Sequence, residues 1–400
     1  MLDISNIRVP LDQLDGTAAT EDRALRAAVL RRLRITPDDL AAVEPRKRSI
    51  DARKKGDVHL TYTVRIQLRG AANAERSLLE RLRRHHAERG VSVVDDVADM
   101  AFRAPVHLGT KRVGRPVVVG AGCAGLFCAL ALAEAGLEPL LVERGQDSGY
   151  RSSSIERFNR TGKLDVESNI QFGLGGAGTF SDGKLATGTK SPLHRHILKT
   201  FVACGAQREI LYDAKPHVGS NVLPTVVTNM CRRIGELGGE VRFSTRMVDL
   251  DTQGGCVRSI TLRQKGSDSG LVVEERLPAA NVVVACGHSA RDVFELLRRR
   301  GVSLERKTFA MGVRIEHLQR DVDRAQYGPF AGHPALGAAP YKLVTHLGNG
   351  RSAFSFCMCP GGYVVAAASE EGGVVTNGMS LSDRKGENAN SGLLANVFPD

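Results

Sequence analysis

Gly120, Gly122 and Gly125 follow a run of valines with the spacing G-x-G-x-x-G. The first glycine allows a tight turn, the second lets a pyrophosphate approach the backbone, and the third lets a helix pack closely on a strand. Cys123 and Ala124 then open a helix whose N-terminal N–H groups attract negative charge. The motif predicts a dinucleotide site, against the alternative of a strand–helix turn without a ligand.

An acidic residue completes this motif. Glu143 ends the next predicted strand, 18 residues after Gly125, where a carboxylate can accept both hydroxyl groups of an adenosine ribose. An acid at this position also argues against a ribose with a 2′-phosphate. We therefore assign Glu143, together with the neighbouring Arg144, to the nucleotide site.

Two further segments extend the predicted site. The first is glycine-rich and typical of a loop whose backbone lies against phosphates or a ring, although a flexible loop would have the same composition. It is not a Walker motif, because Lys184 follows one glycine and precedes Leu185. The second is a buried strand that ends in Ala285, Cys286 and Gly287. From the glycine-rich segment, the residues assigned to the site are Gly175, Gly176, Gly178, Thr179, Ser181, Asp182, Gly183 and Lys184.

These three segments, in this order, resemble the glutathione-reductase-like FAD-binding proteins with two dinucleotide-binding domains. Longer motifs resemble the uncharacterised bacterial FAD-dependent dehydrogenases of that class, and the similarity spans the chain. The motifs are ESN at 167–169, YDAKPH at 212–217, GHSARD at 287–292, GVRIEH at 312–317 and FCMCPGG at 356–362.

The resemblance implies an FAD-dependent oxidoreductase that passes a hydride between flavin N5 and an unidentified small-molecule substrate. It assigns the ADP half of FAD to the first motif and Glu143, the flavin side to residues 173–184, and an adenine-side backbone contact to Val248. Since the sequence shows one dinucleotide signature, we expect NAD(P)H to bind only transiently, or electrons to pass to another donor or acceptor. The late Gly-Asp segment of such families is not found after Gly287, so we expect either that the last domain is truncated or that another element completes the site.

Cys357 and Cys359 form a C-x-C pair beside Pro360. Two thiols next to a flavin can shuttle electrons through a disulfide. In a regular strand, however, positions two apart share a face but lie too far apart for easy pairing. Buried structural thiols are therefore the alternative, and no metal site is predicted.

Four other side chains are candidates for chemistry. His288 can act as an acid or base near the flavin, or it can be a structural histidine. Lys184 can stabilise negative charge on a reduced flavin, or contact a pyrophosphate or the surface. Arg314 and His317 can bind a substrate carboxylate, although exposed positions on a strand explain them as well.

The elements that position these residues form an α/β protein. Residues 1–112 predict a small basic α+β domain, with helices at 22–33 and 74–89, a strand at 58–68, and cationic loop residues at 46–48 and 53–55. Residues 113–300 alternate strands and helices, as in a doubly wound Rossmann-like FAD-binding domain. We expect helices at 123–135 and 223–237, a strand at 240–250, and a β-meander inserted at about 251–280. Residues 301–400 predict a β-rich substrate or cap domain.

Composition narrows the function. The 400 residues carry a net charge of +11, and Lys and Arg exceed Asp and Glu by 22 to 16 in residues 1–112. The basic excess forms a solvated surface or favours acidic partners. A flavoprotein that acts on RNA through this domain is therefore one alternative, and a non-catalytic redox sensor is another. The start lacks a secretory signal, the apolar stretch 117–132 is too short to span a bilayer, and eight scattered cysteines suggest reduced thiols in a cytoplasm.

Overall fold

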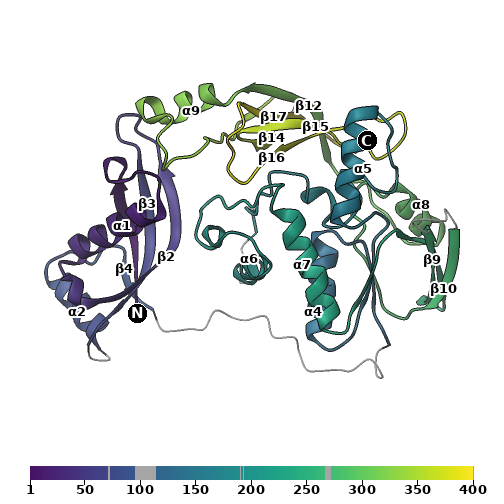
Figure 1. Ribbon diagram of the computed structural model, residues 1–400, viewed down its shortest axis with the longest axis horizontal. Helices are drawn as coiled ribbons and strands as arrows, with labels where there is room; N and C mark the ends of the chain where they lie inside the picture. Colours follow the sequence, from purple (N-terminus) through teal and green to yellow (C-terminus); the bar gives the residue numbers. More distant parts are fainter. Residues whose placement is uncertain (71–72, 95–113, 190, 192, 266–271, 400) are drawn as a thin grey trace.

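The computed structural model describes residues 1–70, 73–94, 114–189, 191, 193–265 and 272–399 (Figure 1). The domain boundary expected at residue 112 lies outside the described residues. Within the described residues, none of the helices is both long and apolar enough to cross a membrane.

The N-terminal part is a four-stranded antiparallel sheet with two helices packed against it. The strand order is β2-β3-β1-β4, and alternate residues of β3 are buried, as expected for a sheet with one covered face. Thr17 begins helix α1 by accepting a hydrogen bond from the backbone N–H of Thr20. The elements are β1 (Leu2–Pro10), α1 (Ala18–Leu33), β2 (Leu40–Asp51), β3 (His59–Leu68), α2 (Ala74–Arg84) and β4 (Val91–Val93), with short 3₁₀ turns at Leu11–Gln13 and Pro37–Asp39.

The expectation of a solvated loop at residues 46–48 was wrong, because these residues belong to strand β2. The backbone of Arg48 pairs with β3 on one side and with Tyr212 and Ala214 of the central domain on the other. The Arg48 side chain binds Asp213 through Nε at 2.7 Å and Glu21 through Nη1 at 2.8 Å. These carboxylates neutralise a charge that the sequence pattern placed in solvent.

A four-stranded parallel sheet of order β11-β5-β6-β7 forms the centre of the molecule. Alternate residues of each strand face opposite sides, so Val118 packs on helices α4 and α7, whereas Val117 and Val119 pack on helix α8 and an antiparallel sheet. Helices were expected on both faces, but the second face carries mainly this antiparallel sheet. The elements are β5 (Val117–Val119), α4 (Cys123–Glu134), β6 (Leu140–Val142), α7 (Leu223–Glu236), β7 (Glu240–Arg242), β8 (Thr245–Gln253), β9 (Cys256–Lys265), β10 (Val272–Pro278), β11 (Val282–Val284) and α8 (Arg291–Arg299).

Two local expectations for this sheet were also wrong. The single strand expected at 240–250 is interrupted at Ser244, which has φ of +50°, so β7 and β8 join different sheets. Strand β11 was expected to be buried, yet Val283 and Val284 are 39% and 38% exposed. Among the described residues β11 pairs only with β5, which leaves it at the edge of the sheet.

The C-terminal part is rich in strands and lies across the top of Figure 1, next to both other parts. Its larger sheet has the order β12-β17-β14-β13, and β15 pairs with β16. Its elements are β12 (Phe309–Leu318), α9 (Gln319–Tyr327), β13 (Val344–His346), β14 (Ser352–Cys359), β15 (Gly362–Ala366), β16 (Thr376–Ser380) and β17 (Asn388–Val397). Helices α5 (Ser148–Thr161) and α6 (Leu193–Ala203) and short 3₁₀ turns at Gly176–Gly178, Arg208–Leu211 and Gly328–Phe330 complete the fold.

Candidate functional site

The first glycine motif joins strand β5 to helix α4. Gly120 has φ of +104°, and a Cβ there would lie 2.6 Å from the carbonyl oxygen of Ala285. A Cβ on Gly125 would lie 1.8 Å from the carbonyl oxygen of Gly120, which explains the close approach of helix and strand. At Gly122, by contrast, the nearest atom to an added Cβ is 3.9 Å away, on Gly176. Gly122 therefore leaves open space in front of the N-terminus of α4.

Glu143 lies at the end of β6, and its side chain is buried beside this turn. Its Oε2 accepts the N–H of Ala121 at 2.7 Å, and Oε1 accepts the N–H groups of Gly145 at 2.9 Å and Gly173 at 3.0 Å. A carboxylate can accept about four hydrogen bonds, so these contacts leave room for about one more. In this conformation Glu143 can serve one ribose hydroxyl, where the sequence predicted two.

The glycine-rich segment at 173–184 divides into two parts. Gly175, Gly176 and Gly178 line the pocket in front of α4, and the N–H of Gly175 donates to the carbonyl of Ala121 at 2.8 Å. The remaining candidates lie outside the lining and hold the segment in place. Thr179 donates to the Leu174 carbonyl, Ser181 to the Gly178 carbonyl and Lys184 to the Met358 carbonyl, Asp182 pairs with Arg384, and Gly183 accepts from Val218.

Arg151, which was not predicted from the sequence, holds the glycine-rich segment in place. Its side chain is fully buried and lies over the Phe180 ring, 4.8 Å from the ring centroid. The guanidinium donates to four backbone carbonyls of residues 169–176, at 2.6 to 3.0 Å. Burial lowers the pKa of Arg151 to about 10, so it stays charged at neutral pH. Arg151 is one arginine in a serine-rich helix, and nothing in the local sequence predicts that it binds these backbone carbonyls.

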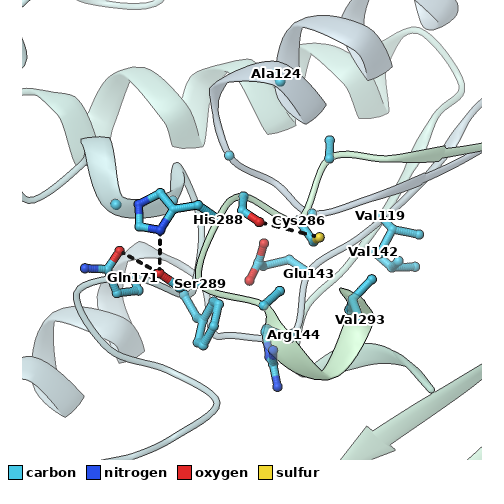
Figure 2. Close-up of a pocket in the computed structure, with 18 of the residues that line it drawn as sticks. Val119, Ala124, Val142, Glu143, Arg144, Gln171, Cys286, His288, Ser289 and Val293 are labelled. Carbon is cyan, nitrogen blue, oxygen red and sulfur yellow. Dashed lines mark hydrogen bonds between the residues drawn. The ribbon is translucent and has the colours of Figure 1, made fainter. Parts of the chain in front are cut away.

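The third segment closes the pocket opposite α4. Ala285, Cys286 and Gly287 all line it, and an added Cβ on Gly287 would meet no atom within 4 Å. Figure 2 shows His288 on the same wall, with Nδ1 at 3.1 Å from the hydroxyl of Ser289, which donates to Gln171. Burial raises the pKa of the Cys286 thiol, which keeps it protonated at neutral pH. Ser289 and Gln171 were not predicted as site residues, although Ser289 lies within the motif at 287–292 and Gln171 lies just before the glycine-rich segment.

Arg144 and the start of β8 form the remaining wall. Arg144 lies over the Phe172 ring, 4.3 Å from its centroid, and its guanidinium pairs with Glu167 and Asp292. Val248, expected at the adenine side, lines a different hollow together with charged residues of β9 and α8. Arg246 and Met247 line the main pocket in its place.

The pocket has a volume of about 320 Å³, within the usual range for ligand sites of about 300–1,000 Å³. It brings together thirteen of the predicted site residues. Those residues are Gly120, Gly122, Cys123, Ala124, Glu143, Arg144, Gly175, Gly176, Gly178, Ala285, Cys286, Gly287 and His288.

The other candidates lie in the C-terminal part. Arg314 donates from Nη1 to Asn390 at 2.6 Å and to the Cys357 carbonyl at 3.3 Å. His317 packs beside Tyr341, with ring centroids 5.5 Å apart, and so does not share these contacts. Cys357 and Cys359 lie next to Arg314, on strand β14. Within the described part of the chain, no group of three or more His, Cys, Asp or Glu side chains is arranged to hold a metal ion.

Comparison with known proteins identifies the class. Residues 308–400 match the family "FAD-dependent protein, C-terminal domain-like", residues 118–181 match an NAD(P)-binding Rossmann-like domain, and residues 1–67 match a domain of unknown function. The protein is FAD-dependent, which confirms the predicted cofactor. It belongs to the family of an uncharacterised protein of Clostridium beijerinckii, which is 39% identical over 399 residues, covering 99% of this chain and 69% of that protein.

Two solved structures show weaker likenesses. A flavin-dependent brominase is 15% identical, with a TM-score of 0.36, over 70% of this chain and 55% of that one. The glycerol-3-phosphate dehydrogenase of Bacillus halodurans, complexed with FAD, is 13% identical, with a TM-score of 0.33, over 73% of this chain and 49% of that one. The chain thus spans about half the length of either structure.

The pocket residues fit the adenosine and pyrophosphate part of FAD. Added Cβ atoms on Gly122, Gly178 and Gly287 would all project into open space, so these glycines leave a cradle for a phosphate chain. The first N–H groups of α4 have no intrahelical partners and face this cradle across Gly122. Glu143 supplies a buried acceptor beside the turn that precedes α4, and its carboxylate points into the pocket in Figure 2.

Proposed function

We propose that the protein is an FAD-dependent oxidoreductase in which a hydride passes between flavin N5 and a small-molecule substrate. The observation that carries this proposal is the convergence of three glycine segments and the Glu143 carboxylate on one pocket. When bound, FAD supplies the redox chemistry, and the protein supplies binding, orientation and electrostatics.

In this proposal, the chain's residues divide the work of holding the nucleotide. The N-terminus of α4 attracts the pyrophosphate, and Glu143 accepts a ribose hydroxyl with its remaining lone pair. Arg144 cannot turn freely toward a ligand, because Phe172, Glu167 and Asp292 hold its guanidinium. Its flat side chain therefore forms a wall of the pocket.

The glycine segment leads from the nucleotide pocket to the C-terminal sheet. Gly178 lines the pocket, and Lys184 binds the backbone of Met358 on β14. This continuity supports a substrate position between the segment and that sheet, within reach of Lys184 and Arg314. His288, oriented by its hydrogen bond to Ser289, is the candidate to hold or release a proton.

The first test is the visible spectrum of the purified protein. We expect flavin absorption bands, and a rise in fluorescence of the heat-released cofactor only after phosphodiesterase cleavage, because FAD is quenched by its own adenine. Gly122→Val should abolish the bound flavin, since its side chain would fill the cradle. Gly56→Val is the matched control, because Gly56 also has open space around it but lies in an exposed turn. Equal flavin contents in the two variants would contradict the assignment of the pocket.

Three expectations remain predictions. If NAD(P)H binds transiently, NADH or NADPH should reduce the flavin and so remove its visible absorption bands. If the protein is only a redox sensor, the flavin should be reduced without turnover of any substrate. Action on RNA predicts binding that weakens steeply with salt and depends on residues 1–112. The pairing of Arg48 with Asp213 and Glu21 removes one cation from the surface that such binding would use.

A further inference from the structure

His288 lies on the wall of the pocket beside Gly287, one of the glycines that leave space for a phosphate chain. The residue is exposed, and within the described part of the chain the only hydrogen-bond partner of its side chain is Ser289. The hydroxyl oxygen of Ser289 lies 3.1 Å from Nδ1. The other ring nitrogen, Nε2, lies on the side of the ring away from Ser289 (Figure 2). His288 is therefore held at one nitrogen and open at the other.

A chain of hydrogen bonds decides which ring nitrogen carries the proton. Gln171 donates from Nε2 to the carbonyl of Ala367 at 3.3 Å, and the reverse orientation of its amide would place two acceptors against each other. Its Oε1 therefore faces Ser289, whose hydroxyl donates to it at 3.4 Å. Because a hydroxyl has one proton, the Ser289 oxygen must accept from Nδ1–H of His288. The chain thus leaves Nε2 without a proton when His288 is neutral.

A bare Nε2 does not suit an anionic ligand. Phosphate oxygens carry lone pairs and negative charge, so they repel the lone pair of a neutral imidazole. A second proton, on Nε2, makes both ring nitrogens donors, and a charged donor forms shorter and stronger hydrogen bonds to phosphate than a neutral one. In this pocket, only the charged form of His288 can both keep its bond to Ser289 and bind a phosphate.

The other ionisable groups around the pocket keep their charge near neutral pH. Burial raises the pKa of the Cys123 and Cys286 thiols, so both stay protonated. The carboxylates and guanidiniums are paired with each other or with backbone N–H groups. They are Glu143 and Arg144 at the end of β6, Glu167, Arg246 on β8, Arg291 and Asp292 on α8, and Glu370, the partner of Arg291. Since histidine changes its charge most readily between about pH 5 and 8, His288 is the group in this pocket that can take up a proton there.

We propose that His288 binds the pyrophosphate of FAD as an imidazolium ion, and that Ser289 and Gln171 position it for this contact. FAD binding then takes up one proton from solvent at Nε2, while Nδ1–H keeps its hydrogen bond to Ser289. Ser289 and Gln171 are positioning residues, since they act through His288. The inference rests on the FAD pocket of the proposed function, and it does not depend on hydride transfer.

Calorimetry of FAD binding to the full chain freed of cofactor tests the proton uptake. Titrations in buffers with different heats of ionisation should show uptake of up to one proton by the wild type and none by His288→Gln. Because the pyrophosphate of FAD stays ionised between about pH 5 and 8, the affinity of the wild type should fall by up to about tenfold for each pH unit in this range. An affinity that does not depend on pH, without proton uptake, would overturn the inference.

His346→Gln is the matched control, because His346 is also exposed and its Nδ1 also contacts a serine hydroxyl, that of Ser352, at 2.8 Å. It lies on β13, outside the lining of the pocket, so this variant should keep the pH dependence of the wild type. Equal pH dependence in the wild type and His288→Gln would contradict the role of His288. A wild type that binds no FAD would overturn the pocket assignment as well, whereas FAD binding without proton uptake would overturn this inference alone.

The positioning residues are tested without FAD. Nitrogen NMR shifts of an isotopically labelled full chain distinguish a protonated from a bare ring nitrogen, and the signal of His288 is the one missing from His288→Gln. We expect the proton on Nδ1 in the neutral form of the wild type and of Ser289→Thr, which keeps the hydroxyl. In Ser289→Ala and Gln171→Leu the proton should move toward Nε2, because Nδ1–H loses its acceptor or the Ser289 hydroxyl is free to donate to Nδ1. A proton on Nε2 in the wild type would show that Ser289 and Gln171 do not position His288.

Discussion

The Glu143 carboxylate joins three separate pieces of the chain at one point. It accepts N–H groups from the turn after β5, from its own strand end and from the second glycine segment. Hydrogen bonds to a charged group contribute about 1.5–3 kcal/mol each. The residue that we assign to the ribose is therefore also the residue that assembles the pocket.

Glu143→Gln tests this double role. The amide NH₂ group would face backbone N–H donors, so at least one hydrogen bond is replaced by a repulsive contact. We expect FAD affinity to fall about 10- to 100-fold, measured by fluorescence titration of the apoprotein. Glu156→Gln, on the exposed face of α5, is the control. An unchanged affinity in Glu143→Gln would show that the carboxylate does not support the site.

At the scale of elements, the glycine segment at 173–184 depends on helix α5 for its shape. A loop of this composition has many accessible conformations, and Arg151 selects one by binding four of its neighbouring carbonyls. The positive φ of Gly173 brings that residue against the Arg151 side chain, where a Cβ would lie 2.4 Å from Cδ. Helix and segment thus form one unit.

Arg151→Met should disrupt this unit. Four buried carbonyls would lose their donor, and we expect a loss of about 3–5 kcal/mol in the free energy of unfolding together with loss of flavin. Arg160→Met, exposed on the same helix, should change stability by less than about 0.5 kcal/mol. Urea unfolding followed by circular dichroism measures both, and equal stabilities would refute the role of Arg151.

At the scale of the whole molecule, ion pairs tie the three parts together. Arg48 links the N-terminal sheet to Asp213 of the central domain, and Arg384 links the C-terminal part to the buried Asp182. The core of the N-terminal sheet also continues into the C-terminal part, where Val322 and Tyr327 of α9 pack on it. The three parts are therefore expected to unfold together.

A double-mutant cycle tests the first link. Arg48→Ala and Asp213→Ala should each destabilise the protein, and the double variant should lose less than the sum, with a coupling of about 1–3 kcal/mol. Arg53→Ala, which removes an exposed side chain paired with Asp51 at the end of β2, should cost less than about 1 kcal/mol. Additive losses at Arg48 and Asp213 would show that the pair does not hold the two parts together.

Acid titration tests the second link. Burial alone would raise the pKa of Asp182, but the hydrogen bond and charge of Arg384 outweigh it and hold the pKa below its usual value of 3.8. A carboxyl with a lowered pKa in the folded state stabilises the protein above about pH 3.8, and this contribution is lost as the pH falls below that value. The stability difference between the wild type and Asp182→Asn should therefore shrink from pH 5 to pH 3. A difference independent of pH would contradict the link.

The sequence by itself determined a dinucleotide site and the main strand–helix pattern, and its resemblance to FAD-binding proteins indicated which cofactor binds there. The G-x-G-x-x-G spacing and Glu143 at the next strand end are local, because the turn, the helix N-terminus and the acid are set within a short βαβ unit. Hydrophobic periodicity likewise located α1, β3 and α7, since each buries one face.

Only the tertiary structure decided the contacts between distant segments. Arg48 was expected to be a cation in a solvated loop, but it is a paired strand residue because Asp213 lies beside it. Arg151 supports the site because the glycine-rich segment folds over it. The irregularity between Phe356 and Cys359, where the Cys359 sulfur contacts the Cys357 carbonyl, depends on the pairing of β14 with β17. Such contacts join residues far apart in the chain, and local spacing and periodicity carry no information about them.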